Sequence, residues 1–527
     1  MDIRELMAEG APARDLAAAL LVRLRALRAE TQAEAAATLD SWAPALAGDG
    51  FRDSAGNLAS YLALRARDLT LEQEALNALG LSSLGRSESN VMASVDAVIA
   101  ALAALAGEGA VAGGVCLGRR RARALIDRRR DAILGVGTPE NTTRILVTLP
   151  SEAATDPGLV AGLVRAGGAA VRINCAHDGP EAWAAMIAHA KAAEAEAGRR
   201  VPVLMDLAGP KVRTRALSVP PEILGREKKK TLKAMRRDGI APSVRGGRLM
   251  RGDRMVLTEA LAPSEPVFAA TLSHPELLDR LKPGAMVWFD DGRIGARVER
   301  VEGRRAELEV LHAPLKGKRL APEKGVNLPG VEVDIPALTK ADRAALDFVV
   351  GHADMIGYSF VQTARDVRGL QAAIADRLPD GAPMPALVLK IETDLAVRNL
   401  PRLIVQAGGS GPVAVMIARG DLAVEIGLER MSEIQEEILW LCEAAEVPVI
   451  WATQVLEGLA KEGFASRAET TDAAMGQRAE AVMLNKGPFA AEAVAFLDRV
   501  LRRMDRHQSK KSPRLAPLRA WKGPEGL

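Results

Sequence analysis

The sequence predicts an α/β protein: a (β/α)8 TIM barrel with a small β-barrel domain inserted after the third strand and an all-helical region before the barrel. Two observations support this prediction. From residue 144 onward, short apolar and β-branched runs alternate with amphipathic helical stretches. These runs are apolar throughout, as expected for parallel strands buried on both faces. Eight strands that are each followed by a helix are typical of a closed barrel.

Residues 1–135 are predicted to form the helical region. Leucines recur at helical spacing between residues 16 and 27, and apolar residues recur in the same way between residues 91 and 105. Each stripe can bury one face of a helix. Seven of the twelve residues from 119 to 130 are arginine. Such a run can bind phosphate or an acidic surface, although it is more often a solvated helix face.

The catalytic barrel is expected at residues 136–214 and 336–506. Its eight strands are predicted at 144–149, 169–175, 201–207, 353–360, 386–392, 413–420, 447–454 and 479–485. A helix from about residue 490 to 506 would complete the barrel, because each strand of this fold is followed by one. The basic, proline-containing tail at 507–527 is predicted to be disordered.

The gap between the third and fourth strands indicates an inserted β domain at 215–335. Its segments alternate polar with apolar residues and contain turn signals such as Asp291-Gly292. We expect this domain to act as a lid over the barrel. A basic stretch at 226–237 lies within it, and the sequence does not indicate whether that stretch binds a partner.

Composition narrows the class of protein. The chain has 527 residues, a net charge of +3 and three widely spaced cysteines. These values argue against disorder, a disulfide framework and a general attraction to nucleic acid. The start, MDIRELMAEG, carries acids where a signal peptide would be basic, and no run is long enough for a membrane span. We therefore expect a cytoplasmic protein with neither a membrane nor a nucleic acid as partner.

Polar residues are expected at the mouth of the barrel, where its parallel strands end. Function sits at this face in such barrels. The polar residues at these strand ends, and just after them, are Arg172, Asn174, His177, Asp206, Lys211, Arg213, Lys390, Glu392, Arg419, Gly420, Asp421, Thr453 and Gln454.

Lys390 and Glu392 are two positions apart on one strand, so both side chains point to the same side. A lysine in the apolar run LVLKIE is costly unless its charge meets an anion; a structural Lys–Glu pair is the alternative. Glu392 and Asp421 come from adjacent strands and could hold Mg²⁺, although both could instead cap helices locally. Residues 419–421 are expected to open a short helix, whose free N–H groups can bind a carboxylate or phosphate.

Taken together, these residues favour an anionic, phosphorylated substrate. The cations Arg172, Arg213 and Lys390 would converge on the same face as the two carboxylates. Neutralising charge that develops on a phosphorylated substrate is what phosphoryl transfer requires. The sequence shows no Ser-His-Asp arrangement, no Cys–His pair and no P-loop, so loops and cations would hold any nucleotide.

Eight segments, in this order and spacing, resemble motifs of the pyruvate kinase family: VRINCAH, DLAGPKVRT, VWFDDGRIG, EKGVNLPG, LKIET, MIARGDLAVE, ATQVLE and SRAETTDA. The resemblance covers about 140–500, including the inserted domain. It implies transfer of the phosphoryl group of phosphoenolpyruvate to ADP, giving pyruvate and ATP in glycolysis, with Mg²⁺ or Mn²⁺ as cofactor. The partners would be phosphoenolpyruvate and ADP or ATP, and the family suggests a homo-oligomer.

The resemblance also implies roles for matching positions. Glu392 and Asp421 would hold the metal, Lys390 would stabilise the transferring group and the enolate, and Arg172 would clamp the phosphoryl group. Thr453 would lie beside the carbon that receives a proton. The backbone at Gly420 and Asp421 would receive the substrate carboxylate. The residues expected near the nucleotide phosphates or a monovalent cation are Asn174, His177, Arg213 and Lys324. Asp291 would take part when the lid closes.

Several departures from the family pattern bear on its K⁺ requirement. Two oxygen ligands of K⁺ in many members are missing, because their positions hold Ala176 and Leu207. The glutamate usual in the turn after the third strand is Lys211, as in the K⁺-independent group. A tethered ammonium can supply the charge of the bound ion, so Lys211 is predicted to be a K⁺ surrogate.

Other departures leave alternatives open. The first barrel loop is shortened at Leu149-Pro150, the loop after the eighth strand is 485-NKGP-488, and a family lysine is Ala208. The tail is too short for the C-terminal domain that carries effector sites in many members, so regulation by sugar phosphates there is not expected. A non-catalytic sensor or scaffold, and another Mg²⁺-dependent barrel enzyme acting on an enolpyruvate or 2-oxo acid, remain alternatives.

Overall fold

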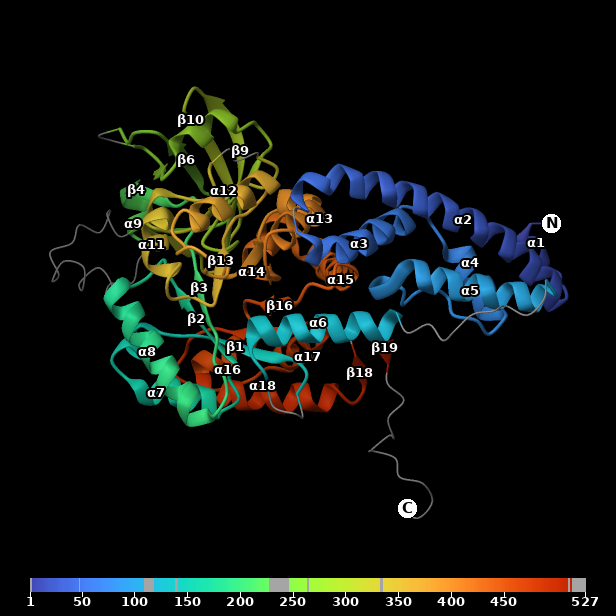
Figure 1. The fold of residues 1–527 in the computed structure, drawn as a ribbon. Helices are drawn as coiled ribbons and strands as arrows, with labels where there is room; N and C mark the ends of the chain where they lie inside the picture. Colours follow the sequence, from blue (N-terminus) through green and yellow to red (C-terminus); the bar gives the residue numbers. More distant parts are fainter. Residues whose placement is uncertain are drawn as a thin grey trace, which may run out of the picture.

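The computed structural model describes residues 2–46, 48–108, 118–137, 141–226, 246–262, 265–331, 335–509 and 512–513. Figure 1 shows a helical region that extends to one side of a barrel and a β domain that stands above the barrel. Most of the basic stretch at 226–237, and residues 514–527 of the tail, lie outside the described residues.

The helical region is built around one long helix. Its helices are α1 (Ile3–Ala8), α2 (Ala13–Trp42), α3 (Arg52–Arg65), α4 (Thr70–Ala78) and α5 (Val91–Ala106). The predicted leucine stripe of α2 is buried, and α2 packs against α3 and α5. The segment Glu88–Ala106 is long and apolar enough to cross a membrane. Its buried residues, such as Val91 and Leu102, instead join the same apolar core as α2.

The predicted barrel is confirmed. Eight parallel strands close on themselves: β1 (Arg144–Thr148), β2 (Ala170–Asn174), β3 (Val203–Asp206), β13 (Met355–Tyr358), β14 (Ala386–Ile391), β15 (Val413–Ala418), β16 (Val449–Ala452) and β17 (Ala481–Leu484). Most side chains of these strands are apolar and buried on both faces of the sheet, which is why the runs do not alternate between apolar and polar residues. The helices around them are α7 (Pro157–Arg165), α8 (Pro180–Ala197), α11 (Lys340–Val349), α12 (Ala364–Ala375), α13 (Asp394–Gly408), α14 (Arg419–Ile426), α15 (Leu428–Ala444), α16 (Glu457–Glu462), α17 (Arg467–Met475) and α18 (Ala490–Met504).

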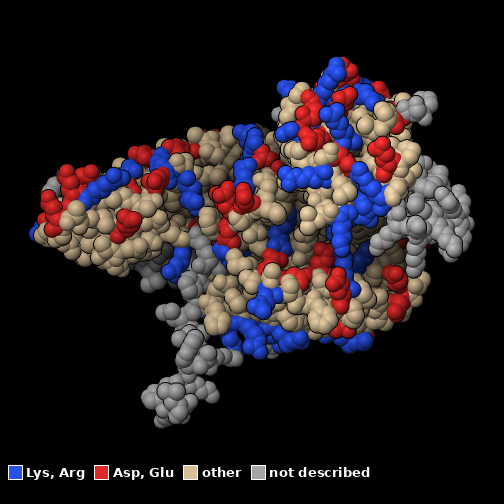
Figure 2. Space-filling view, turned by 180° about the vertical axis from the view of Figure 1, so that it is seen from behind, with Lys and Arg blue, Asp and Glu red and all other residues tan. Residues whose placement is uncertain are grey.

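The inserted domain, called the lid below, has its own apolar core. Its elements are β4 (Thr214–Ser218), α9 (Pro221–Leu224), β5 (Gly247–Leu249), β6 (Arg254–Thr258), β7 (Phe268–Leu272), the 3-10 helix η6 (Pro275–Arg280), β8 (Met286–Phe289), β9 (Ile294–Glu302), β10 (Arg305–His312), β11 (Lys318–Leu320) and β12 (Val326–Asn327). They form a seven-stranded mixed sheet and a two-stranded pair rather than a single closed barrel. Acidic and basic side chains are interspersed over the lid and the helical region (Figure 2).

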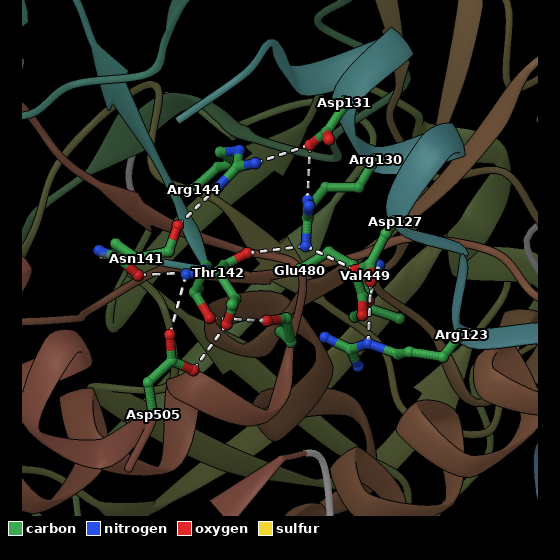
Figure 3. Close-up of polar contacts among 12 residues, drawn as sticks. Arg123, Asp127, Arg130, Asp131, Asn141, Thr142, Arg144, Val449, Glu480 and Asp505 are labelled. Atoms are coloured by element: carbon green, nitrogen blue, oxygen red, sulfur yellow. Dashed lines mark hydrogen bonds and ion pairs between the residues drawn. The ribbon is translucent and has the colours of Figure 1, made fainter. Parts of the chain in front are cut away.

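The floor of the barrel, at the amino ends of its strands, is closed by α6 (Gly118–Leu134). Leu134 of this helix shares a core with strand residues. Arg144 donates to the carbonyls of Gly135 and Asn141 and to Asp131, and Arg130 also pairs with Asp131 (Figure 3). The arginine-rich run is therefore not simply a solvated face, because its last arginine, Arg130, is buried in this polar network, whereas Arg128 is exposed.

The helical region docks on the barrel through α3 and α15. Ser54 donates to Glu446 at 2.6 Å, and Asn57 donates to the carbonyl of Ala444 at 2.8 Å. The guanidinium of Arg65 lies 5.0 Å from the ring centre of Trp440, a favourable cation–π contact. The amino-terminal region thus belongs to the same packed body as the barrel.

The beginning of the tail differs from its prediction. Gln508–Ser509 and Ser512–Pro513 pair as two short antiparallel strands, β18 and β19, where the sequence predicts disorder. The side chain of Gln477 donates to the carbonyl of Gln508 and holds this strand pair to the barrel. A four-residue pairing of this kind has no periodicity that a sequence could reveal.

Candidate active site

Lys390, on β14, lies at the centre of the polar cluster in the barrel mouth. Its ammonium nitrogen is 2.6 Å from Oγ of Ser359, 3.2 Å from Oε1 of Glu392 and 3.3 Å from Oδ2 of Asp206. Burial lowers the pKa of Lys390, but Asp206 and Glu392 more than offset it, so the pKa lies above its usual value. The amine is therefore a fixed positive charge, and it contacts Glu392, two positions away on the same strand.

Asp206 links this lysine to Arg172. The guanidinium of Arg172 donates to Oδ2 of Asp206 at 2.8 Å. Burial alone would raise the pKa of Asp206, but Lys390 and Arg172 hold it below its usual value. Gly357 leaves room for the carboxylate, because a Cβ there would lie 2.4 Å from Oδ1 of Asp206. This oxygen is buried and has no hydrogen-bond partner among the described residues.

The carboxylate of Glu392 is buried, which disfavours its charged form. Only 3% of its surface is exposed, and burial raises its pKa; Lys390 opposes that shift while Asp421 adds to it. The backbone N–H of Phe360 donates to Oε2 of Glu392 at 2.6 Å. Two carboxylates that disfavour each other's charge fit a shared divalent cation, which would neutralise both.

No group of three or more His, Cys, Asp or Glu suited to a metal occurs in the described part of the chain. A site with two protein carboxylates is still adequate for Mg²⁺, because this ion keeps several waters and takes substrate oxygens. Glu392 and Asp421 therefore fit such an ion as partial ligands.

Lys211 connects the barrel mouth to the lid. Its ammonium is 2.8 Å from Oδ1 of Asp421 and 3.2 Å from Oδ1 of Asp291 in the lid. Burial lowers the pKa of Lys211, but the two carboxylates raise it above its usual value. A permanent positive charge thus sits next to one candidate metal ligand.

Thr453 follows β16 in a strained backbone conformation. Its φ of +63° is rare for a β-branched residue, and Gln454 beside it has a φ of +57°. The hydroxyl oxygen of Thr453 accepts a hydrogen bond of 2.7 Å from the backbone N–H of Gly420, at the start of α14. The N–H predicted to receive a substrate carboxylate is therefore held by Thr453 in this structure.

A cavity of about 500 Å³ opens beside Arg172. Asn174 and His177 line it, as does Asp291 from the lid, so three of the residues predicted near the nucleotide or the lid closure meet here. Arg213 and Lys324 do not line this cavity. Arg213 donates to the carbonyl of Glu323, and Lys324 pairs with Asp290 at 2.8 Å, both at the base of the lid.

Sequence reasoning missed the roles of three residues. Asp206 was expected only as a polar strand end, yet it is the shared partner of Arg172 and Lys390. Ser359 and Phe360 follow β13 and were not expected to contribute, although they contact Lys390 and Glu392 respectively. The position of Asp206 at the end of a strand could have indicated its role in the sequence. Nothing in the sequence indicated a role for Ser359 or Phe360.

The barrel sequence is similar to that of known proteins. The family model "pyruvate kinase, barrel domain" matches residues 140–494. A pyruvate kinase of Agrobacterium vitis is 32% identical over 69% of this chain and 69% of its own length. Pyruvate kinase 1 of Trypanosoma brucei brucei is 31% identical over 64% of this chain and 62% of its own length. A pyruvate kinase of Geobacillus stearothermophilus is 29% identical over 69% of this chain, which spans only 57% of that relative.

Proposed function

The chain belongs to the pyruvate kinase family of phosphotransferases, and from that premise we propose that it transfers the phosphoryl group of phosphoenolpyruvate to ADP, giving pyruvate and ATP. The observation that carries the proposal is the position of Lys390. This buried ammonium lies among Asp206, Glu392 and Ser359 at the end of β14, where function sits in such barrels.

Charge neutralisation is the main task of these side chains. Lys390 and Arg172 supply positive charge for the phosphoryl oxygens and for the enolate that remains when the phosphoryl group leaves. Asp206 keeps both cations oriented, because its carboxylate contacts each of them. Thr453, whose hydroxyl lies at the start of α14, would stand beside the carbon that takes up a proton.

We propose Mg²⁺ or Mn²⁺ as the cofactor, held by Glu392 and Asp421. When bound, such an ion would draw negative charge from the substrate oxygens and so favour cleavage of the phosphate ester. The raised pKa of buried Glu392 supports this assignment, since a nearby cation would relieve it. Asp291 approaches the mouth from the lid, and closure there would exclude water, which competes with ADP as acceptor.

We further propose that the enzyme needs no K⁺. Lys211 places an ammonium 2.8 Å from Asp421, and it can take the part of a bound monovalent cation. Replacing K⁺ in the assay with a bulky tetraalkylammonium ion should leave turnover nearly unchanged. A loss of about tenfold, equal to about 1.4 kcal/mol, would contradict this proposal.

A coupled assay tests the main proposal. Purified protein with phosphoenolpyruvate, ADP and Mg²⁺ should produce pyruvate, measured by its reduction, and Lys390→Met should abolish turnover because a fixed charge is lost. The control Lys340→Met removes an exposed lysine at the start of α11 and should keep full activity. Binding of phosphoenolpyruvate without turnover would indicate a non-catalytic protein. Pyruvate released without ADP would indicate a different enolpyruvate reaction.

A further inference from the structure

A second large cavity lies outside the barrel mouth, where the lid meets the barrel. Its volume is about 580 Å³, within the range of small-molecule sites. The wall comes from η6 of the lid, from α11 and α12 of the barrel, and from the segment that follows β13. None of the residues assigned above to catalysis, metal or nucleotide lines it.

Three arginines from three different elements line this cavity: Arg280 from η6, Arg343 from α11 and Arg365 from α12. All three side chains are exposed. None of these side chains makes an ion pair or a hydrogen bond with the residues that the structure describes, whereas Arg377 and Arg419, for example, pair with Asp347 and Asp472. Their positive charge is therefore available to a ligand.

The acid on the described wall does not neutralise these arginines. The carboxylate of Asp366 accepts hydrogen bonds from the backbone N–H of Thr363 at 2.8 Å and from its hydroxyl at 3.0 Å. It also accepts one from the N–H of Gln362 at 3.1 Å. These contacts are all made by Oδ2, and they cap the start of α12. With one carboxylate against three guanidinium groups, the described wall keeps a surplus of positive charge.

The shape and chemistry of the wall define the class of ligand. Guanidinium groups match phosphate oxygens in a two-pronged geometry, and three arginines line this cavity. Apolar side chains, among them Ile335, Leu338 and Leu395, line another part of the wall and suit a carbon skeleton. We propose that this cavity, called the arginine pocket below, binds a phosphorylated small molecule.

The arginine pocket is joined to the mouth through Phe360. This residue lines the pocket, has a φ of +55°, and donates its N–H to the candidate metal ligand Glu392 at 2.6 Å. Arg280 belongs to the lid, whereas Arg343 and Arg365 belong to the barrel, so one ligand would contact both parts. A bound phosphate compound is thus placed to influence the mouth, and any such coupling must be reciprocal.

Site-resolved chemical labelling tests the pocket directly. Phenylglyoxal modifies accessible arginines, and mass spectrometry of peptides reports each position. Glycerol 3-phosphate should protect Arg343 and Arg365, compared with chloride at equal ionic strength. The exposed Arg402 on α13, which lies outside the pocket, should stay unprotected and serves as the control. Equal labelling of Arg343 and Arg365 with and without glycerol 3-phosphate would overturn the proposal.

A binding experiment separates the arginine pocket from the mouth. Glycerol 3-phosphate is titrated calorimetrically while saturating phosphoenolpyruvate and Mg²⁺ occupy the mouth. The double variant Arg343→Gln/Arg365→Gln should bind at least about tenfold more weakly, and Arg402→Gln should bind as the unchanged protein does. Thermal unfolding checks that each variant is folded. Unchanged affinity in the double variant would reject the pocket. The labelling result stands even if the chain proves to have no kinase activity.

Discussion

The two ends of the barrel hold similar charged residues but differ in how far the protein itself pairs their charges. At the floor, Arg144 and Arg130 share Asp131 and also donate to backbone carbonyls, so each cation is satisfied within the protein. At the mouth, Lys390 is shared by two carboxylates, and Glu392 is buried with a raised pKa. The cations of the floor are satisfied within the protein, whereas the mouth keeps charge that a ligand must complete.

Whether charged groups are satisfied within the protein is a better indicator of a functional site than the presence of charge alone. A buried polar network with every group satisfied makes a structure rigid. An unsatisfied buried group costs stability and persists where it serves a role. The unpartnered Oδ1 of Asp206 and the two mutually repelling carboxylates, Glu392 and Asp421, all lie at the mouth. The prediction for the two ends is therefore opposite: substitutions at the mouth should affect turnover, and substitutions at the floor should affect stability.

Among the substitutions that compare the two ends, the largest effect is expected for Asp421→Ala. Loss of this carboxylate removes one of two proposed metal ligands, so kcat should fall by about 10³-fold while the melting temperature changes little. Steady-state kinetics and thermal unfolding measure the two quantities. Asp291→Ala is the matched control, because Asp291 shares the contact with Lys211 but is not a proposed metal ligand. Its kcat should fall much less, and equal losses in the two variants would remove the distinction.

A smaller effect, on stability alone, is expected for Arg144→Met at the floor. Arg144 is 5% exposed, and its removal leaves the carbonyls of Gly135 and Asn141 and one oxygen of Asp131 with a lost donor. The free energy of unfolding should fall by about 3 kcal/mol. Denaturant titration measures this change, and the KM for phosphoenolpyruvate should stay constant.

An exposed ion pair provides the comparison for the floor. Arg165 and Glu196 form a salt bridge in which both side chains are more than half exposed, at 61% and 52%. Arg165→Met should cost less than about 1 kcal/mol, because solvent screens such pairs. If Arg144→Met were equally mild, the floor network would not be a stabilising structure and the contrast between the two ends would fail.

The sequence predicts what depends on local pattern. The barrel follows from uninterrupted apolar runs, and the meeting of Lys390 with Glu392 follows from the two-residue period of a strand. Contacts that depend on the register between strands could not be predicted from the sequence. Asp206 meets Arg172 and Lys390 only because β3 lies beside β2 and, through β13, near β14. Likewise, the sequence alone suggests that the arginine-rich helix α6 is solvated. Only the fold shows that Arg130 of this helix shares Asp131 with Arg144 at the floor.

A pH-dependent effect on stability is expected at Glu425, at the rim between mouth and lid. Asn327 of the lid donates to its Oε1 at 3.3 Å. Burial raises the pKa of Glu425 to about 7; Asn327 opposes the shift, and Asp421 and Asp394 add to it. The folded protein thus holds this proton more tightly than the unfolded chain does. Stability from this group is fully present below about pH 4.5 and is lost as the pH rises towards 7.

Glu425→Gln should remove this dependence, because the amide stays neutral and its oxygen can still accept from Asn327. Between pH 5 and pH 8, the unchanged protein should lose on the order of 2 kcal/mol relative to the variant, measured by urea unfolding at each pH. Glu429→Gln, at an exposed position of α15, should follow the unchanged protein at every pH. Parallel curves for Glu425→Gln and the unchanged protein would mean that Glu425 is charged like any surface carboxylate. The rim would then resemble the floor, where the charged side chains are satisfied within the protein.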